Sequence, residues 1–187
     1  MSSIDVEQVW WRRVQLGEFY NIERAPQIPG GGGSLYIEIP TSMKEKTLNF
    51  LGYSLQEGEA ALPIVINARV IGDPETIGKL EFNSKAGNRL RISKQNRQQP
   101  ASMRHPAWTK PYGFPEAPDT LKNREEASAF FPEGGLRIYI VRTRSGEYYA
   151  GFTVGERPAD MAPDDPNWEL YNNSDVGGVF DTRRKNG

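Results

Sequence analysis

The stretch that decides the fold is Leu136-Arg-Ile-Tyr-Ile-Val-Arg-Thr143, then Arg144-Ser-Gly146, then Glu147-Tyr-Tyr-Ala-Gly-Phe-Thr-Val154. Both outer runs are rich in Tyr, Ile and Val, residue types that fit a pleated, half-buried surface. The three residues between them end in glycine, which suits a short hairpin connection. The stretch therefore predicts an antiparallel hairpin and a fold built on β-sheet.

Working outward from this hairpin, four shorter segments also have the composition of strands. They are 35–39, which Pro40 ends, then 63–71, 77–83 and 89–93. In the third segment Leu80 and Phe82 fall on one face, and Gly72-Asp73-Pro74 before it predicts a turn. In the last segment Leu90 and Ile92 are expected to face inward, while Arg89, Arg91 and Ser93 face outward.

Two helices are expected between the strands. One spans 41–51, with Ser42 and Glu45 as a capping box and Gly52 after its end. The other spans 120–131, with Asp119 or Thr120 as its cap. The aromatic-rich residues 6–20 are compatible with a helix or a strand, whereas 21–34 and 95–118 are rich in breakers or polar residues and predict loops.

These elements predict a mainly β (α+β) fold of about seven strands with two or three short helices, arranged as a barrel or sandwich. We expect residues 1–187 to form one domain, with 176–187 as a tail or a linker to another domain. No internal repeat and no series of parallel βαβ units is present in the sequence.

The composition excludes several kinds of chemistry. The chain has no cysteine and one histidine, His105, so disulfides, thiolate zinc sites and cysteine nucleophiles are impossible. His105 lies in a Met-Arg-His-Pro run and is interpreted as an exposed loop residue rather than a general base. The glycines 30–33 lack the Lys-Ser/Thr of a phosphate loop. We therefore predict a non-enzymatic domain without metal or cofactor. The sequence shows neither a secretory signal nor an apolar run long enough for a membrane helix, so we expect a cytoplasmic location.

Charge is distributed unevenly along the chain. The net charge is −1, yet no acidic residue occurs between Glu81 and Glu116. That window holds seven lysines and arginines, which leaves 16 basic against 24 acidic residues in the rest of the chain. A basic segment on an acidic body is typical of a local nucleic-acid footprint, although a solvated basic loop has the same composition.

Two segments carry residue types suited to duplex DNA. Around 85–97, arginine is suited to guanine, asparagine to adenine and lysine to phosphate. The loop 21–34 adds Asn21, Glu23, Arg24 and Gln27, and a glutamate can accept from the cytosine amino group. Two such arms would hold the major groove from both sides.

Two motifs in these segments resemble a known family. Gly31-Gly-Gly-Ser-Leu-Tyr-Ile37 resembles the first arm and following strand of the N-terminal domain of EcoRII-type restriction endonucleases. Phe82-Asn-Ser-Lys85 followed by Asn88-Arg-Leu-Arg-Ile-Ser93 resembles that family's second arm. The resemblance covers roughly residues 15–145, and the second motif is its more specific part. The family domain is a DNA-binding pseudobarrel, similar to the B-three domain of plant transcription factors.

The resemblance implies sequence-specific binding of double-stranded DNA, at a CCWGG-type site, by a recognition or effector domain that does not cleave. Cleavage would belong to a covalently linked nuclease domain. The first arm would contain Asn21, Glu23, Arg24, Gln27, Gly32 and Ser34. The second arm would contain Lys85, Asn88, Arg89, Arg91, Ser93, Lys94 and Arg97. Asn88 and Arg91 match the family motif best, whereas Leu90 replaces a basic residue and the strand before Pro40 is two residues longer than in the family.

Two other functions remain open from the residues alone. A small metal-dependent nuclease would use Glu81 and Lys85, although their spacing differs from the usual acidic-x-lysine pair. A protein- or carbohydrate-interaction module would use the aromatic residues Trp108, Tyr112 and Phe114, although packing of these residues over the end of the barrel is the favoured interpretation.

Overall fold

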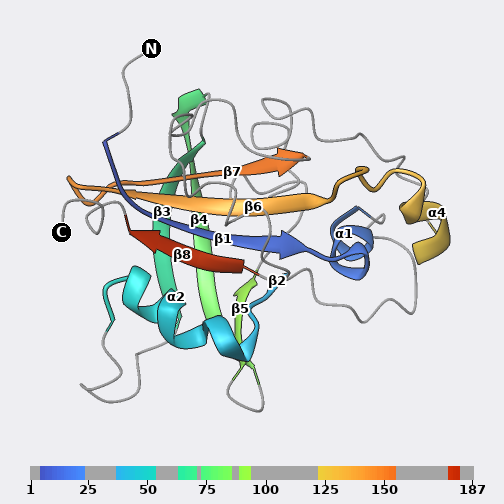
Figure 1. Cartoon of the computed structure of the whole chain (residues 1–187), viewed down its shortest axis with the longest axis horizontal. Helices are drawn as coiled ribbons and strands as arrows, with labels where there is room; N and C mark the ends of the chain where they lie inside the picture. Colours follow the sequence, from blue (N-terminus) through green and yellow to red (C-terminus); the bar gives the residue numbers. More distant parts are fainter. Residues whose placement is uncertain are drawn as a thin grey trace.

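The computed structural model describes residues 5–23, 37–53, 63–70, 73–85, 89–93, 122–154 and 177–181. Within these ranges one curled sheet of eight strands forms a half-barrel, with the strand order β2-β5-β4-β3-β7-β6-β1-β8 (Figure 1). The strands β3 and β4 cross the direction of β1, β6 and β7 in this view. The mainly β prediction is thereby confirmed. Among the described residues, no helix combines the length and the apolar character needed to cross a membrane.

One side of the sheet is built on the predicted hairpin. β6 (Leu136–Thr143) and β7 (Tyr148–Val154) pair antiparallel. Gly146 in the turn between them has a φ of 86°, a backbone conformation that favours glycine. β1 (Val6–Val14) pairs along β6, and β8 (Gly177–Asp181) pairs with the other edge of β1. The ambiguous segment 6–20 is therefore a strand followed by the helix α1 (Leu16–Glu23).

The other side of the sheet is an antiparallel series. β3 (Ile64–Val70) pairs with β4 (Asp73–Lys85), β4 with β5 (Arg89–Ser93), and β5 with the two-residue β2 (Ile37–Glu38). A short parallel ladder between β3 and β7 joins the two sides, with Ala68 opposite Tyr148. β4 is longer than predicted. Asp73 pairs with Val70 across an irregularity in the ladder, so the strand includes Asp73 and Pro74, which were predicted to belong to a turn.

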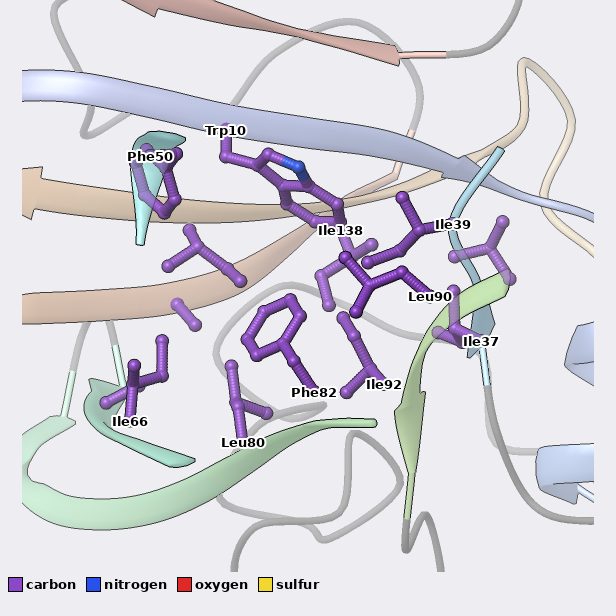
Figure 2. Packing of buried hydrophobic residues seen from close by; sticks show 14 of the residues in the cluster. Trp10, Ile37, Ile39, Phe50, Ile66, Leu80, Phe82, Leu90, Ile92 and Ile138 are labelled. Atoms are coloured by element: carbon purple, nitrogen blue, oxygen red, sulfur yellow. The ribbon is translucent and has the colours of Figure 1, made fainter. Parts of the chain in front are cut away.

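The hollow of the half-barrel is filled by one apolar core (Figure 2). Trp10 from β1 lies edge-on to Phe82 from β4, with ring centroids 6.5 Å apart. The Trp10 indole N–H donates to the Thr47 hydroxyl at 2.8 Å, so this buried donor is satisfied. Leu80 and Phe82 share the inward face of β4 as predicted, and the inward residues of β5, Leu90 and Ile92, are at most 1% exposed.

A second apolar cluster lies on the opposite face of β1 and β6. Its buried members, here called the outer cluster, are Val9, Trp11, Tyr139 and Val141. All four are at most 4% exposed, so β1 and β6 are buried on both faces. By contrast, β3 alternates between buried and exposed residues along its length. The sheet thus changes from two-sided to one-sided burial between its halves.

The helix boundaries differ from those predicted. A 3-10 turn, η1 (Thr41–Met43), precedes α2 (Lys44–Phe50), and neither has a side-chain cap. The predicted capping box is therefore wrong: the chain already turns at Thr41, which places Ser42 inside the turn instead of at an extended cap. Gly52 follows α2 with a φ of 85°, as a C-terminal glycine should.

The second predicted helix is shorter and is capped elsewhere. α4 (Arg124–Ser128) starts after Asn123, whose side-chain oxygen accepts from the Glu126 backbone N–H at 2.9 Å. The expected caps, Asp119 and Thr120, lie outside the described residues. Asn123 is extended, with φ −153° and ψ 172°, so the helix cannot begin at residue 120.

The C-terminal part of the chain also departs from expectation. The residues 177–181, expected to belong to a tail, form β8 and pair with β1 from Gln8 to Arg12. Gly177 is necessary there, because a Cβ at this position would lie 2.5 Å from the Trp11 carbonyl oxygen and 2.6 Å from the Met43 sulfur. The absence of a side chain at Gly177 lets β8 pair closely with β1, and local sequence patterns do not reveal this approach.

Candidate nucleic-acid interface

The outward face of β2, β5 and β4 carries the best-described candidate residues. The register places Arg91 opposite Glu38 on one side and opposite Asn83 on the other. Residues paired across a sheet project on the same face, so these three form one row. Because Leu90 and Ile92 are buried, Arg89 and Arg91 face away from the core, as predicted. We call this surface, defined by Glu38, Asn83, Arg89 and Arg91, the β5 face.

An ion pair lies on this surface. The Arg89 guanidinium donates to the Glu38 carboxylate at 3.1 Å, and the two side chains are 58% and 36% exposed. Arg91 and Asn83 are half-buried, and the Asn83 amide lies 3.4 Å from the Glu81 carboxylate. The β5 face therefore combines guanidinium, amide and carboxylate groups within one narrow strip of sheet.

The predicted second arm, 85–97, is divided by the sheet. Lys85 pairs with Arg89 at one end of β5, and Ser93 pairs with Glu81 at the other. Because β5 rises about 3.3 Å per residue, these ends are roughly 13 Å apart. The residues between them form a strand in the sheet, so Arg91 lies in the middle of the surface.

The first predicted arm starts and ends at fixed points of the fold. α1 ends at Glu23, and β2 begins at Ile37 beside Ile92. Since β2 runs antiparallel to β5, the segment 24–36 joins the sheet at the Ser93 end of β5. Asn21 and Glu23 belong to the last turn of α1, so their assignment to a loop was wrong: the helix that begins at Leu16 continues through them.

A largely buried ion pair links β1 to the start of α1, and a backbone hydrogen bond links it to β2. Arg12 on β1 forms two hydrogen bonds to Glu18 in α1, at 2.7 and 2.8 Å, and is 3% exposed. The Glu18 carboxylate also accepts from the Gln15 and Glu38 backbone N–H groups, at 2.9 and 3.2 Å. Arg12 and Glu18 thus connect β1, the start of α1 and the strand β2 on the β5 face.

Several predicted site residues cannot be placed. Outside the described residues lie Arg24, Gln27, Gly32, Ser34, Asn88, Lys94, Arg97, His105, Trp108, Tyr112 and Phe114. For Lys85 and Ser93 the structure describes the backbone alone. The described part of the second motif is therefore Arg89 and Arg91 with their neighbours on β2 and β4.

The residues proposed for a nuclease are separated on one strand. Glu81 and Lys85 are four positions apart in β4, which corresponds to about 13 Å between Cα atoms. A metal-assisted nuclease requires carboxylates gathered around one ion. Among the residues that the structure describes, no group of three or more aspartate, glutamate or histidine side chains is gathered in this way. The geometry offers this alternative no support.

Glu38 and Asn83 join the candidate surface without having been singled out in the sequence. Each stands in a predicted strand segment, but only the register shows that both flank Arg91. The alternation around Leu90 and Ile92 indicates which residues of β5 point outward. It does not indicate which residues of other strands lie beside them, because that depends on long-range pairing.

Comparison with known proteins does not assign the chain to a family. No family model matches it, and no curated protein matches it in sequence. The proposals below therefore depend on the geometry of the β5 face and on the chemistry of its residues.

Proposed function

We propose that this protein binds double-stranded DNA sequence-specifically through the β5 face and the two segments that flank it. In this proposal it is the recognition domain of a cytoplasmic restriction endonuclease with a CCWGG-type site, and a linked domain cleaves. The observation that carries the proposal is the outward projection of Arg89 and Arg91 from a strand whose other side is fully buried.

Physical arguments support this choice of ligand. Three of the four residues that define the surface, Asn83, Arg89 and Arg91, lie within the sequence window that has seven basic residues and no acidic one. An arginine that projects from the face of a strand can form two hydrogen bonds to guanine, and an asparagine can do so with adenine. A rigid strand limits the motion of these side chains, because their backbone is fixed by the ladders to β2 and β4.

Substitution of Arg91 tests the surface directly. If Arg91 reads a base, Arg91→Ala should weaken binding of the preferred duplex by about 1–3 kcal/mol and relax preference at one position. Fluorescence anisotropy with the preferred and the single-mismatch duplexes would measure both effects. Arg144→Ala is the matched control, because Arg144 is an exposed arginine in the β6–β7 turn. Equal affinities of the Arg91 variant and wild type would contradict the assignment.

Selection of bound duplexes from a random pool tests the function as a whole. We expect an enriched motif, with affinity that falls as salt rises because neutralised phosphates release counterions. Incubation of plasmid DNA with Mg²⁺ is the companion assay, and we expect no cleavage. Recovery of no duplex at low salt would refute DNA binding, whereas cleavage abolished by Glu81→Gln would favour the nuclease.

A further inference from the structure

The Glu38 carboxylate already occupies one donor of the Arg89 guanidinium, a group that a phosphate or a base could otherwise use. It accepts from the Arg89 guanidinium at 3.1 Å, and its neighbour across the ladder is Arg91. A carboxylate and a phosphate present the same kind of anionic acceptor to an arginine. Any polyanion that uses Arg89 must therefore displace Glu38 or come close to its negative charge.

The backbone of Glu38 is held independently of this ion pair. Its N–H donates to Glu18 at 3.2 Å, and Glu18 is fixed by two hydrogen bonds from the buried Arg12. The neighbouring Ile37 and Ile39 are at most 2% exposed. Glu38 thus has a fixed main chain and a side chain that is free to exchange partners at the surface.

The Arg89–Glu38 pair contributes little to the stability of the fold. Both side chains are well exposed, and exposed ion pairs gain little because solvent screens them and two long side chains lose freedom. The pair is therefore easily opened. What it changes is the electrostatic potential at the surface, where the Glu38 carboxylate offsets the positive charge of Arg89.

We propose that Glu38 is a built-in anionic competitor that restrains Arg89 and lowers the affinity of the β5 face for any polyanion. A phosphate that contacts Arg89 must displace the carboxylate or come close to its negative charge. The inference concerns DNA only in so far as the proposed function holds. The masking of Arg89 is a property of the surface, which can be tested with a polyanion that is not DNA.

The test is a double-mutant cycle with two probes, immobilised heparin and a short random-sequence DNA duplex. Glu38→Gln should elute from heparin at higher salt and bind the duplex roughly 1.5- to fivefold more tightly at low salt, the range expected for one exposed ion pair. The gain should be absent when the Glu38→Gln/Arg89→Gln double variant is compared with the Arg89→Gln variant, because no Arg89 guanidinium is left to unmask.

Asp5→Asn is the matched control. Asp5 forms an exposed ion pair with Arg144, also at 3.1 Å, and its removal changes the net charge by the same amount. Asp5 precedes the start of β1, whereas α1 and β2 lie near the end of that strand. Asp5→Asn should leave both probes nearly unaffected.

The outcomes separate the two proposals. If Glu38→Gln behaves like Asp5→Asn, or if its gain persists without Arg89, the competitor role is refuted even when DNA binds. If the heparin shift appears and depends on Arg89 while no variant binds any duplex, the competitor role stands and the DNA-binding function fails.

Discussion

The two halves of the sheet, β2 to β5 and β1 with β6 to β8, differ in how their faces are buried. β1 and β6 are buried on both faces, by the central core on one and by the outer cluster on the other. β3 and β4 bury one face, and their other face is open at Val65 and Ile77, each 50% exposed. A strand that is packed on both sides has no surface left for a ligand. The difference indicates that stability is concentrated in the β1–β6 half, and that the other half can present functional side chains.

The largest expected effect concerns the outer cluster. Trp11→Ala should reduce the free energy of unfolding by about 3–5 kcal/mol, because it empties a site that is almost fully buried. Ile77→Ala on the open face of β4 should change it by less than about 0.5 kcal/mol. Urea denaturation measures both variants. Similar losses in the two would show that the halves do not differ in packing.

A close approach in the two-sided half gives the next effect. Gly177→Ala should cost about 3 kcal/mol, near the upper end for overpacking, because the new methyl meets a backbone oxygen that cannot rotate away. Gly178→Ala is the control, since its Cβ would meet the Trp11 indole nitrogen at an ordinary 3.5 Å. Thermal denaturation of both variants checks the difference, and an unaffected Gly177 variant would mean that β8 is not packed against β1.

A matched isosteric pair compares the outward positions of the two halves. Val141→Thr places a hydroxyl in the outer cluster and should cost about 1–2 kcal/mol, since a buried polar group loses its water. Val65→Thr makes the same change at a half-exposed position and should alter stability by less than about 0.5 kcal/mol. If chemical denaturation finds the order reversed, the burial contrast between the halves is wrong.

The smallest effect is a pH dependence at the junction of the halves. Burial raises the pKa of Tyr148, while the nearby Arg142 opposes that shift. The unfolded chain therefore loses this proton first, and stability should fall as the pH rises above the ordinary tyrosine value of about 10. Tyr148→Phe should flatten this fall in urea titrations, and Tyr149→Phe, on the other face of the same strand, should not. An identical alkaline profile in both variants would contradict the burial of the phenol.

Local patterns in the sequence predict much of this fold. The alternation in 64–70 and 89–93, and the hairpin around Gly146, depend on neighbouring residues and appear as expected. β8 contains two adjacent glycines and is stabilised by β1, far away in the chain, so no local pattern indicates it. The buried Arg12 was not predicted either, because its partner Glu18, six residues along the chain, lies on a different element.

The candidate site was predicted in part: the orientation of its arginines could be predicted, but not their neighbours on other strands. The outward orientation of Arg89 and Arg91 follows from the apolar residues between and beside them. The row formed by Glu38, Arg91 and Asn83 depends on two strand registers, which a single sequence does not specify. The division of the second arm by β5 follows from the strand predicted at 89–93.

The parallel ladder between β3 and β7 has a consequence for how the chain folds. The hairpins β3–β4 and β6–β7 each close over short distances, whereas Ala68 and Tyr148 are 80 residues apart in the sequence. Contacts of such separation are slow to form, because closing a long loop costs entropy before the contact returns any energy. We expect the two hairpins to form early and β7 to dock beside β3 later.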